Sequence, residues 1–137
     1  MKIPQGLTNT QFNHLSRVVR TKAAELGLGD DLIIQGSRAT GTAKPTSDID
    51  ISIRLSPEEF NNFLFNQSKL SRINPGSAKE KTLLRAIETG KIQAGEACLS
   101  AVRKKLERSL GIEVDLSVIK AGGAFDKGAQ IPLSSLD

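Results

Sequence analysis

Two carboxylates two positions apart, Asp48 and Asp50, are the residues of this sequence best placed to do chemistry. They begin a segment, residues 48–55, in which polar and apolar residues alternate strictly, and this pattern predicts a half-buried strand. Side chains two apart on a strand leave the same face, so the carboxylates are expected on the order of 7 Å apart. At an effective dielectric near 20 their repulsion is about 2–3 kcal/mol, so a pair in a cleft requires a counter-charge. Mg²⁺, held by one or two carboxylates and by substrate phosphates, supplies such a charge.

A second alternating segment, residues 112–119, provides a third carboxylate, Asp115. If the two strands are neighbours, this group completes a two-metal site, which stabilises the attacking and leaving oxygens in phosphoryl or nucleotidyl transfer. Glu113 lies on the same strand face as Asp115 by alternation and is an alternative to it.

Residues that could hold phosphate stand between a short apolar run, residues 32–34, and the first acidic strand. Gly36 lets the backbone approach a ligand closely, and the turn after it can point N–H groups and the Ser37 hydroxyl at a triphosphate. Arg38 and Lys44 add positive charge nearby. We therefore predict a phosphate site beside the acidic strand.

Further cations surround a predicted helix that could face substrate, namely Lys79, Lys81, Arg85 and Lys91. Lys79 and Arg85 are the candidate substrate-binding residues among them. Glu80 and Glu88 are interspersed with them, so an ordinary solvated helix face is the alternative interpretation.

Helical periodicity and capping signals predict the elements around these strands. Apolar residues at helical spacing predict a helix over residues 9–26, with Thr8 or Thr10 as its cap. Capping boxes at residues 56–59 and 77–80 predict two more helices, separated by a break at residues 74–76, and the second is expected to end near residue 89. A last helix is predicted to end at Gly111 and to turn inward Ile92, Leu99, Val102, Leu106 and Leu110.

The whole chain of 137 residues is predicted to be one domain, residues 1–137, with an irregular tail over about residues 121–137. Helices between separated strands predict an α/β (α+β) fold, with a short mixed β-sheet, helices packed on one face and acidic residues on the other. A single cysteine, Cys98, and a single histidine, His14, exclude an internal disulfide and zinc sites built on several Cys or His ligands. We find no signal peptide and no apolar run that could cross a bilayer, so we expect action in a cytoplasm and no membrane association.

The acidic and glycine motifs resemble the signature of the DNA polymerase β-type nucleotidyltransferase superfamily. The shared pattern is a strand ending in Gly-Ser, ten intervening residues, Asp-hydrophobic-Asp-hydrophobic, and a later Asp between hydrophobic residues. It covers about residues 30–55 and 112–119 and is similar to the minimal members. The resemblance implies that Asp48 and Asp50 hold two Mg²⁺ or Mn²⁺ ions on a nucleoside triphosphate (NTP). It also implies that Asp115 binds the metal that activates the acceptor hydroxyl, and that Gly36 and Ser37 hold the phosphates.

A narrower resemblance concerns the whole chain. The segments GSRATGTAKPTSDIDI and NPGSAKEKTLLRAIETGKIQAGEA, with the final QIPL, resemble nucleotidyltransferase toxin domains of large secreted bacterial polymorphic toxins. These include filamentous-haemagglutinin-like and contact-dependent growth inhibition effectors. The resemblance implies a secreted or cell-surface parent protein, action in the cytoplasm of a neighbouring bacterium and a cognate immunity protein.

The expected function is Mg²⁺-dependent transfer of a nucleoside monophosphate from an NTP to a hydroxyl of RNA, with tRNA ends favoured, or of a protein. Two alternatives stay open: a non-catalytic binding module or antitoxin-like protein with this fold, and a small-molecule nucleotidyltransferase of the aminoglycoside type. The sequence has no Trp or Tyr and five Phe, several of them on predicted core faces. The chain therefore has few aromatic side chains on which exposed bases could stack. Recognition of an RNA acceptor is expected to depend on the shape of the RNA and on its phosphates.

Overall fold

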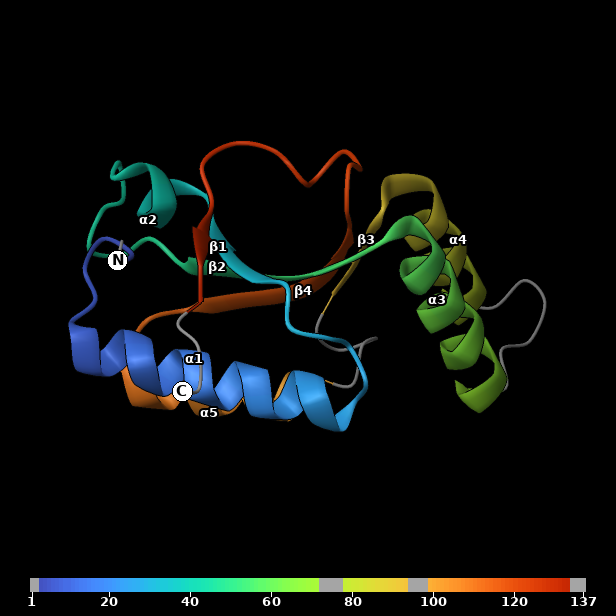
Figure 1. Cartoon of the computed structure of the whole chain (residues 1–137), viewed down its shortest axis with the longest axis horizontal. Coiled ribbons are helices and arrows are strands. Elements are labelled where there is room, and N and C mark those ends of the chain that lie inside the picture. The colour runs from blue at the N-terminus through green and yellow to red at the C-terminus, as the bar shows by residue number, and fades with distance from the viewer. Residues whose placement is uncertain (1–2, 72–77, 94–98, 134–137) are drawn as a thin grey trace.

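The computed structural model describes residues 3–71, 78–93 and 99–133, and these form one mixed β-sheet with helices (Figure 1). The strand order is β3-β4-β2-β1-β5, and β2 and β4 are parallel while the other neighbours are antiparallel. In chain order the elements are α1 (Asn9–Glu25), β1 (Leu32–Gln35), α2 (Ser37–Thr40), β2 (Ile49–Leu55), α3 (Pro57–Ser71), α4 (Ala78–Thr89), β3 (Lys91–Gln93), α5 (Ser100–Leu110), β4 (Val114–Lys120) and β5 (Ile131–Pro132). The predicted fold class is confirmed.

Local signals in the sequence explain where several elements begin and end. Thr8 caps α1 and exchanges side-chain and backbone hydrogen bonds with Gln11, and Ser56 and Glu59 do the same at the start of α3. Gly111 ends α5 in the left-handed conformation, as predicted. These caps satisfy backbone groups that a helix end leaves without partners.

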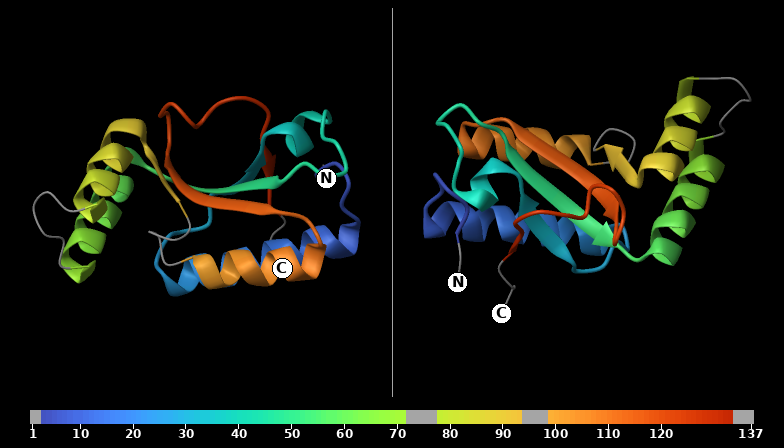
Figure 2. Two further views of the ribbon diagram at one scale, coloured as in Figure 1. Left: turned by 180° about the vertical axis from the view of Figure 1, so that it is seen from behind. Right: turned by 90° about the horizontal axis from the view of Figure 1, so that it is seen from above.

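The hydrophobic core lies between the sheet and the antiparallel pair α1 and α5, which cover one face (Figures 1 and 2). The alternating residues of β2 and β4 that point to this face are fully or almost fully buried, and Leu15 and Leu106 contribute from the two helices. The other sheet face carries Asp50 and Asp115. Residues 121–130 cross above this face as an arch and partly cover it (Figure 2).

One prediction about the later part of the chain is wrong. Ile92 does not lie on the inner face of a helix, because Gly90, with φ +79°, ends α4 and the chain then pairs as β3 with β4. In the predicted tail, residues 121–130 form turns and bends without helix or strand, and β5 then pairs with β1, Ile131 opposite Ile34. A three-residue and a two-residue strand are too short to show periodicity in the sequence.

Some predictions fall outside the described residues, namely the break at residues 74–76, the start of the capping box at Ser77, and Cys98. Within the described part of the chain no helix is long and apolar enough to cross a membrane.

Candidate active site

The centre of the candidate site is a pair of carboxylates on neighbouring parallel strands. Asp50 of β2 and Asp115 of β4 are register partners, and Asp50 also stands opposite Gln35 of β1. The Oδ1 atom of Asp50 is buried and finds no hydrogen-bond partner among the described residues. Burial, and then the nearby charges of Asp115 and Asp48, raise the pKa of Asp50. The pair therefore holds more negative charge than its surroundings compensate.

The other predicted acidic residues take different places. Asp48 is exposed immediately before β2, close enough to act on the pKa of Asp50. Glu113 is exposed before β4, and its backbone carbonyl accepts the amide of Ile49. Asp115, and not Glu113, is thus the carboxylate that faces Asp50.

A cation from the group around the predicted helix, Lys91, lies beside the pair. The Nζ of Lys91 on β3 is 3.9 Å from Oδ2 of Asp115 and 4.8 Å from the centre of the Phe125 ring. Its charge lowers the pKa of Asp50, against the larger effect of burial. The sequence places Lys91 at a helix boundary and gives no sign that it lies near Asp115, because that proximity depends on the pairing of β3 with β4.

The predicted phosphate turn lies directly against Asp50. Gly36 follows β1 with φ +74° and ψ −157°, a conformation that only glycine adopts readily. A methyl group built on Gly36 would sit 3.5 Å from the Cβ of Asp50 and 3.7 Å from its Oδ2. Ser37, half-buried, follows as the first residue of α2. Gly36 and Ser37 are therefore brought together with the acidic pair.

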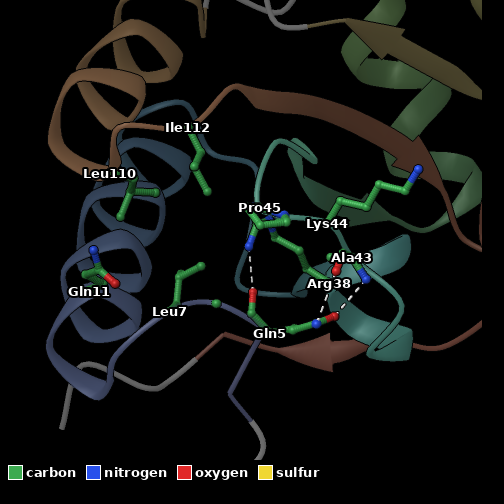
Figure 3. Close-up of a pocket in the computed structure, with 10 residues that line it drawn as sticks. Gln5, Leu7, Gln11, Arg38, Ala43, Lys44, Pro45, Leu110 and Ile112 are labelled. Carbon is green, nitrogen blue, oxygen red and sulfur yellow. Dashed lines mark hydrogen bonds between the residues drawn. The ribbon is translucent and has the colours of Figure 1, made fainter.

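Arg38 is held inside the protein instead of being presented to the acidic face. Its guanidinium donates from Nη1 to the carbonyl of Gln5 (2.7 Å) and from Nη2 to that of Ser47 (2.7 Å). These bonds fasten the loop before β2 to the N-terminal segment. Lys44, exposed on that loop, lines with Arg38 a hollow of about 330 Å³ and extends away from Leu110 (Figure 3).

The two predicted substrate-binding cations of α4 are not shown to join the site. Arg85 is exposed, and its carbonyl accepts the hydroxyl of Thr89. Lys79 belongs to α4, but its side chain lies outside what the structure describes.

Residues 121–130, which we call the arch, are fastened over the polar face by buried and half-buried side chains. Arg54 of β2 binds Asp126 at 2.8 Å and Gln130 at 2.9 Å. Gln35 donates to the carbonyl of Phe125 (2.9 Å) and accepts from Ser52 (2.7 Å). A backbone hydrogen bond from the loop itself, followed by the Arg54 contact, lowers the pKa of Asp126. Residues 121–130 of the predicted tail thus cover the sheet face beside the acidic pair.

The donor atoms fit a hard divalent cation that is shared with a ligand. Over the described residues, no group of three or more His, Cys, Asp and Glu side chains could by itself enclose an ion. Mg²⁺ does not require such a group, because it is usually held by one or two carboxylates, waters and substrate phosphates. The buried, unpartnered Oδ1 of Asp50 opposite Asp115 provides the oxygen ligands for this arrangement.

Comparison with known proteins gives one family. No curated protein and no solved structure matches the chain. A family model described as a nucleotidyltransferase domain matches residues 16–128, which include the acidic pair, the Gly36 turn and most of the arch. The position of these residues agrees with the superfamily that the motifs indicated, and the chain belongs to the nucleotidyltransferase domain family.

Proposed function

We propose that this domain transfers a nucleoside monophosphate from an NTP to a hydroxyl acceptor in a Mg²⁺-dependent reaction. The observation that carries the proposal is the Asp50–Asp115 pair, with its buried unpartnered oxygen, beside the turn at Gly36. Family membership supports a transferase activity in general. The two carboxylates and the turn supply the metal and phosphate ligands that this chemistry needs.

Each residue of the site has a role in the proposed reaction. The turn at Gly36 and Ser37 holds the phosphates, and Asp48, Asp50 and Asp115 hold Mg²⁺ or Mn²⁺. When bound, these ions would offset the charge of the phosphates and favour the ionised acceptor oxygen. The acceptor oxygen forms a bond to the α-phosphorus, and the bond from that phosphorus to the β-phosphate oxygen breaks. Pyrophosphate leaves, and the hydroxyl proton passes to a carboxylate oxygen of Asp115.

For the acceptor and the biological role, we propose RNA, with a tRNA end favoured over a protein side chain, and a toxin domain of a bacterial competition system. The support is the resemblance of residues 36–51, 74–97 and 130–133 to such domains. In this proposal the domain acts in the cytoplasm of a target bacterium and is neutralised by a cognate immunity protein.

A label-transfer assay tests the reaction. Each α-³²P-labelled NTP is incubated with Mg²⁺, bacterial lysate and protein, and the products are separated on RNA and protein gels. We expect a labelled band that disappears in Asp50→Asn and Asp115→Asn and persists in Glu113→Gln, the matched change at an exposed neighbouring carboxylate. Turnover by a folded Asp50→Asn protein would contradict the proposed role of the pair.

Binding provides a test that does not depend on finding the acceptor. Because a ligand that binds only the native state stabilises it, millimolar Mg²⁺ with an NTP should raise the melting temperature of the wild-type protein. No rise with any NTP would favour the non-catalytic binding module instead.

A further inference from the structure

An aromatic side chain stands exposed on the arch. The relative exposure of Phe125 is 41%, and Leu84 is the other large hydrophobic residue exposed among the described residues. The Phe125 backbone is held by Gln35, which is itself buried and bonded to Ser52. The backbone that carries the ring is therefore held by a hydrogen bond from the sheet.

A partly buried cation stands under this ring. The Lys91 side chain is 17% exposed, with Nζ 4.8 Å from the ring centre and 3.9 Å from the Asp115 carboxylate. At 3.9 Å the contact with Asp115 is an ion pair and no hydrogen bond. An anionic oxygen of a ligand could therefore approach the ammonium more closely than Asp115 does. The ammonium lies over the ring, and an exposed ring in contact with a cation offers partners for the base and the phosphate of one nucleotide.

The order of the strands separates Lys91 and Phe125, which we call the corner, from the phosphate turn at Gly36. Across the sheet, β3 with Lys91 comes first, then β4 with Asp115, β2 with Asp50 and β1 with Gln35, which Gly36 follows. Lys91 pairs with Ile119 of β4 and approaches Asp115 through its side chain. In an in-line displacement the attacking and leaving oxygens lie on opposite sides of the phosphorus. If the NTP phosphates occupy the Gly36 turn, the corner of Lys91 and Phe125 faces the attacking reactant.

We propose that Lys91 and Phe125 bind the terminal nucleotide of a polynucleotide acceptor, with the base on the Phe125 ring and a phosphate on the Lys91 ammonium. The inference rests on the proposed function for the placement of the NTP. It also revises the expectation from composition, because the exposed Phe125 of the arch would provide stacking near Asp115, which Lys91 joins to the ring.

Because the sequence has no Trp, Phe125→Trp creates a single fluorescent reporter at this corner. The variant keeps Asp50 and is titrated with a single-stranded RNA of about ten nucleotides or with NTP and Mg²⁺ alone, because neither reactant can undergo transfer without the other. We expect saturable quenching by RNA and little response to NTP. Replacing Lys91 by Met should weaken the RNA titration about tenfold, and replacing it by Arg should largely restore binding.

Kinetics of the protein without the reporter provide a second readout. For an RNA acceptor, Phe125→Leu should raise KM about tenfold or more and change kcat and the KM for NTP little. Leu84→Ala removes the other exposed large hydrophobic side chain among the described residues. It should leave the KM for RNA, the KM for NTP and kcat unchanged. Thermal unfolding checks that each variant is folded.

The outcomes separate this inference from the proposed function. Three results would each overturn the proposed role of the corner, even if label transfer is confirmed: quenching by NTP alone, no response to RNA, or an unchanged KM for RNA in Phe125→Leu. Exclusive labelling of protein would overturn it as well. Absence of Mg²⁺-dependent NTP binding would instead contradict the proposed reaction.

Discussion

Asp50 and Asp115 stand opposite each other on parallel strands, and Asp50 keeps a buried oxygen without a hydrogen-bond partner among the described residues. This arrangement lowers the stability of the folded protein when no ligand is bound, because a buried polar atom without a hydrogen-bond partner is unfavourable. Like-charge proximity adds to the cost. Such local instability is typical of a site whose compensating charge arrives with a ligand.

Removing the Asp50 charge should therefore stabilise the free protein. The pKa of Asp50 is raised on folding, so the native state binds the proton more tightly than the unfolded chain does, and stability falls as the pH rises above the ordinary value of about 3.9. At pH 7 we expect Asp50→Asn to melt roughly 2–6 °C higher than wild type. The difference should vanish in acid, below about pH 3.9. Melting curves across this range check the prediction, and a lower melting temperature at pH 7 would contradict it.

The turn at Gly36 should not tolerate a side chain. Its φ of +74° with ψ −157° is strained for any other residue, by about 1–3 kcal/mol. We expect Gly36→Ala to lower stability by this amount and to weaken NTP binding, since the turn lies against Asp50. Gly41→Ala is the matched control: it also has positive φ, +85°, but an added methyl group meets nothing within 4 Å. It should lose about 1–2 kcal/mol and keep NTP affinity. Equal losses of affinity in both variants would exclude a special role for Gly36.

The ion pair between Arg54 and Asp126 should fasten the arch. The side chains are 24% and 12% exposed, and the contact is 2.8 Å, so we expect a coupling energy of about 1–2 kcal/mol in a double-mutant cycle of Arg54→Met and Asp126→Asn. The pKa of Asp126 is lowered on folding, so this stabilisation is present at neutral pH and is lost as the pH falls through the folded pKa. Faster amide exchange around Phe125 in both single variants would show that the arch has loosened. A coupling energy near zero would contradict the prediction.

Arg38 should contribute more to the folding stability of the protein than to phosphate binding. Its buried guanidinium donates to the carbonyls of Gln5 and Ser47, and Arg38→Met leaves both without these donors. We expect a loss of about 3 kcal/mol in the free energy of unfolding. The exposed Lys44 serves as control, because Lys44→Met should change stability by less than about 0.5 kcal/mol. Denaturant titration measures both. Weaker NTP binding by Arg38→Met at unchanged stability would support the phosphate role predicted from sequence.

Much of the fold could be predicted because its signals are local. Strict alternation predicted β2 and β4, and the pairs Thr8 with Gln11 and Ser56 with Glu59 predicted two helix starts. The acidic pair could be predicted too, because strand periodicity determines which face each carboxylate takes.

The positions that sequence reasoning could not predict depend on contacts between distant segments. Ser52 and Ser117 alternate as exposed residues would, but both are buried because the polar face is covered. Lys91 and Phe125 come from a three-residue strand and a glycine-rich loop, and neither has a pattern of its own. Their proximity to Asp115 follows only from the pairing of β3 with β4 and from the path of the arch.

The parallel pairing of β2 with β4 also determines when the site can form. Between these strands the chain passes through α3, α4, β3 and α5, so Asp115 reaches Asp50 only after a long loop has closed. Closing such a loop costs chain entropy before any contact compensates, and contacts of this kind form slowly. The antiparallel pair β1 and β2, joined by a short connection, assembles the Gly36 turn and Asp50 earlier. The polypeptide is thus expected to pass through synthesis and early folding with half of its acidic centre, and the complete centre arises only once β4 has paired with β2.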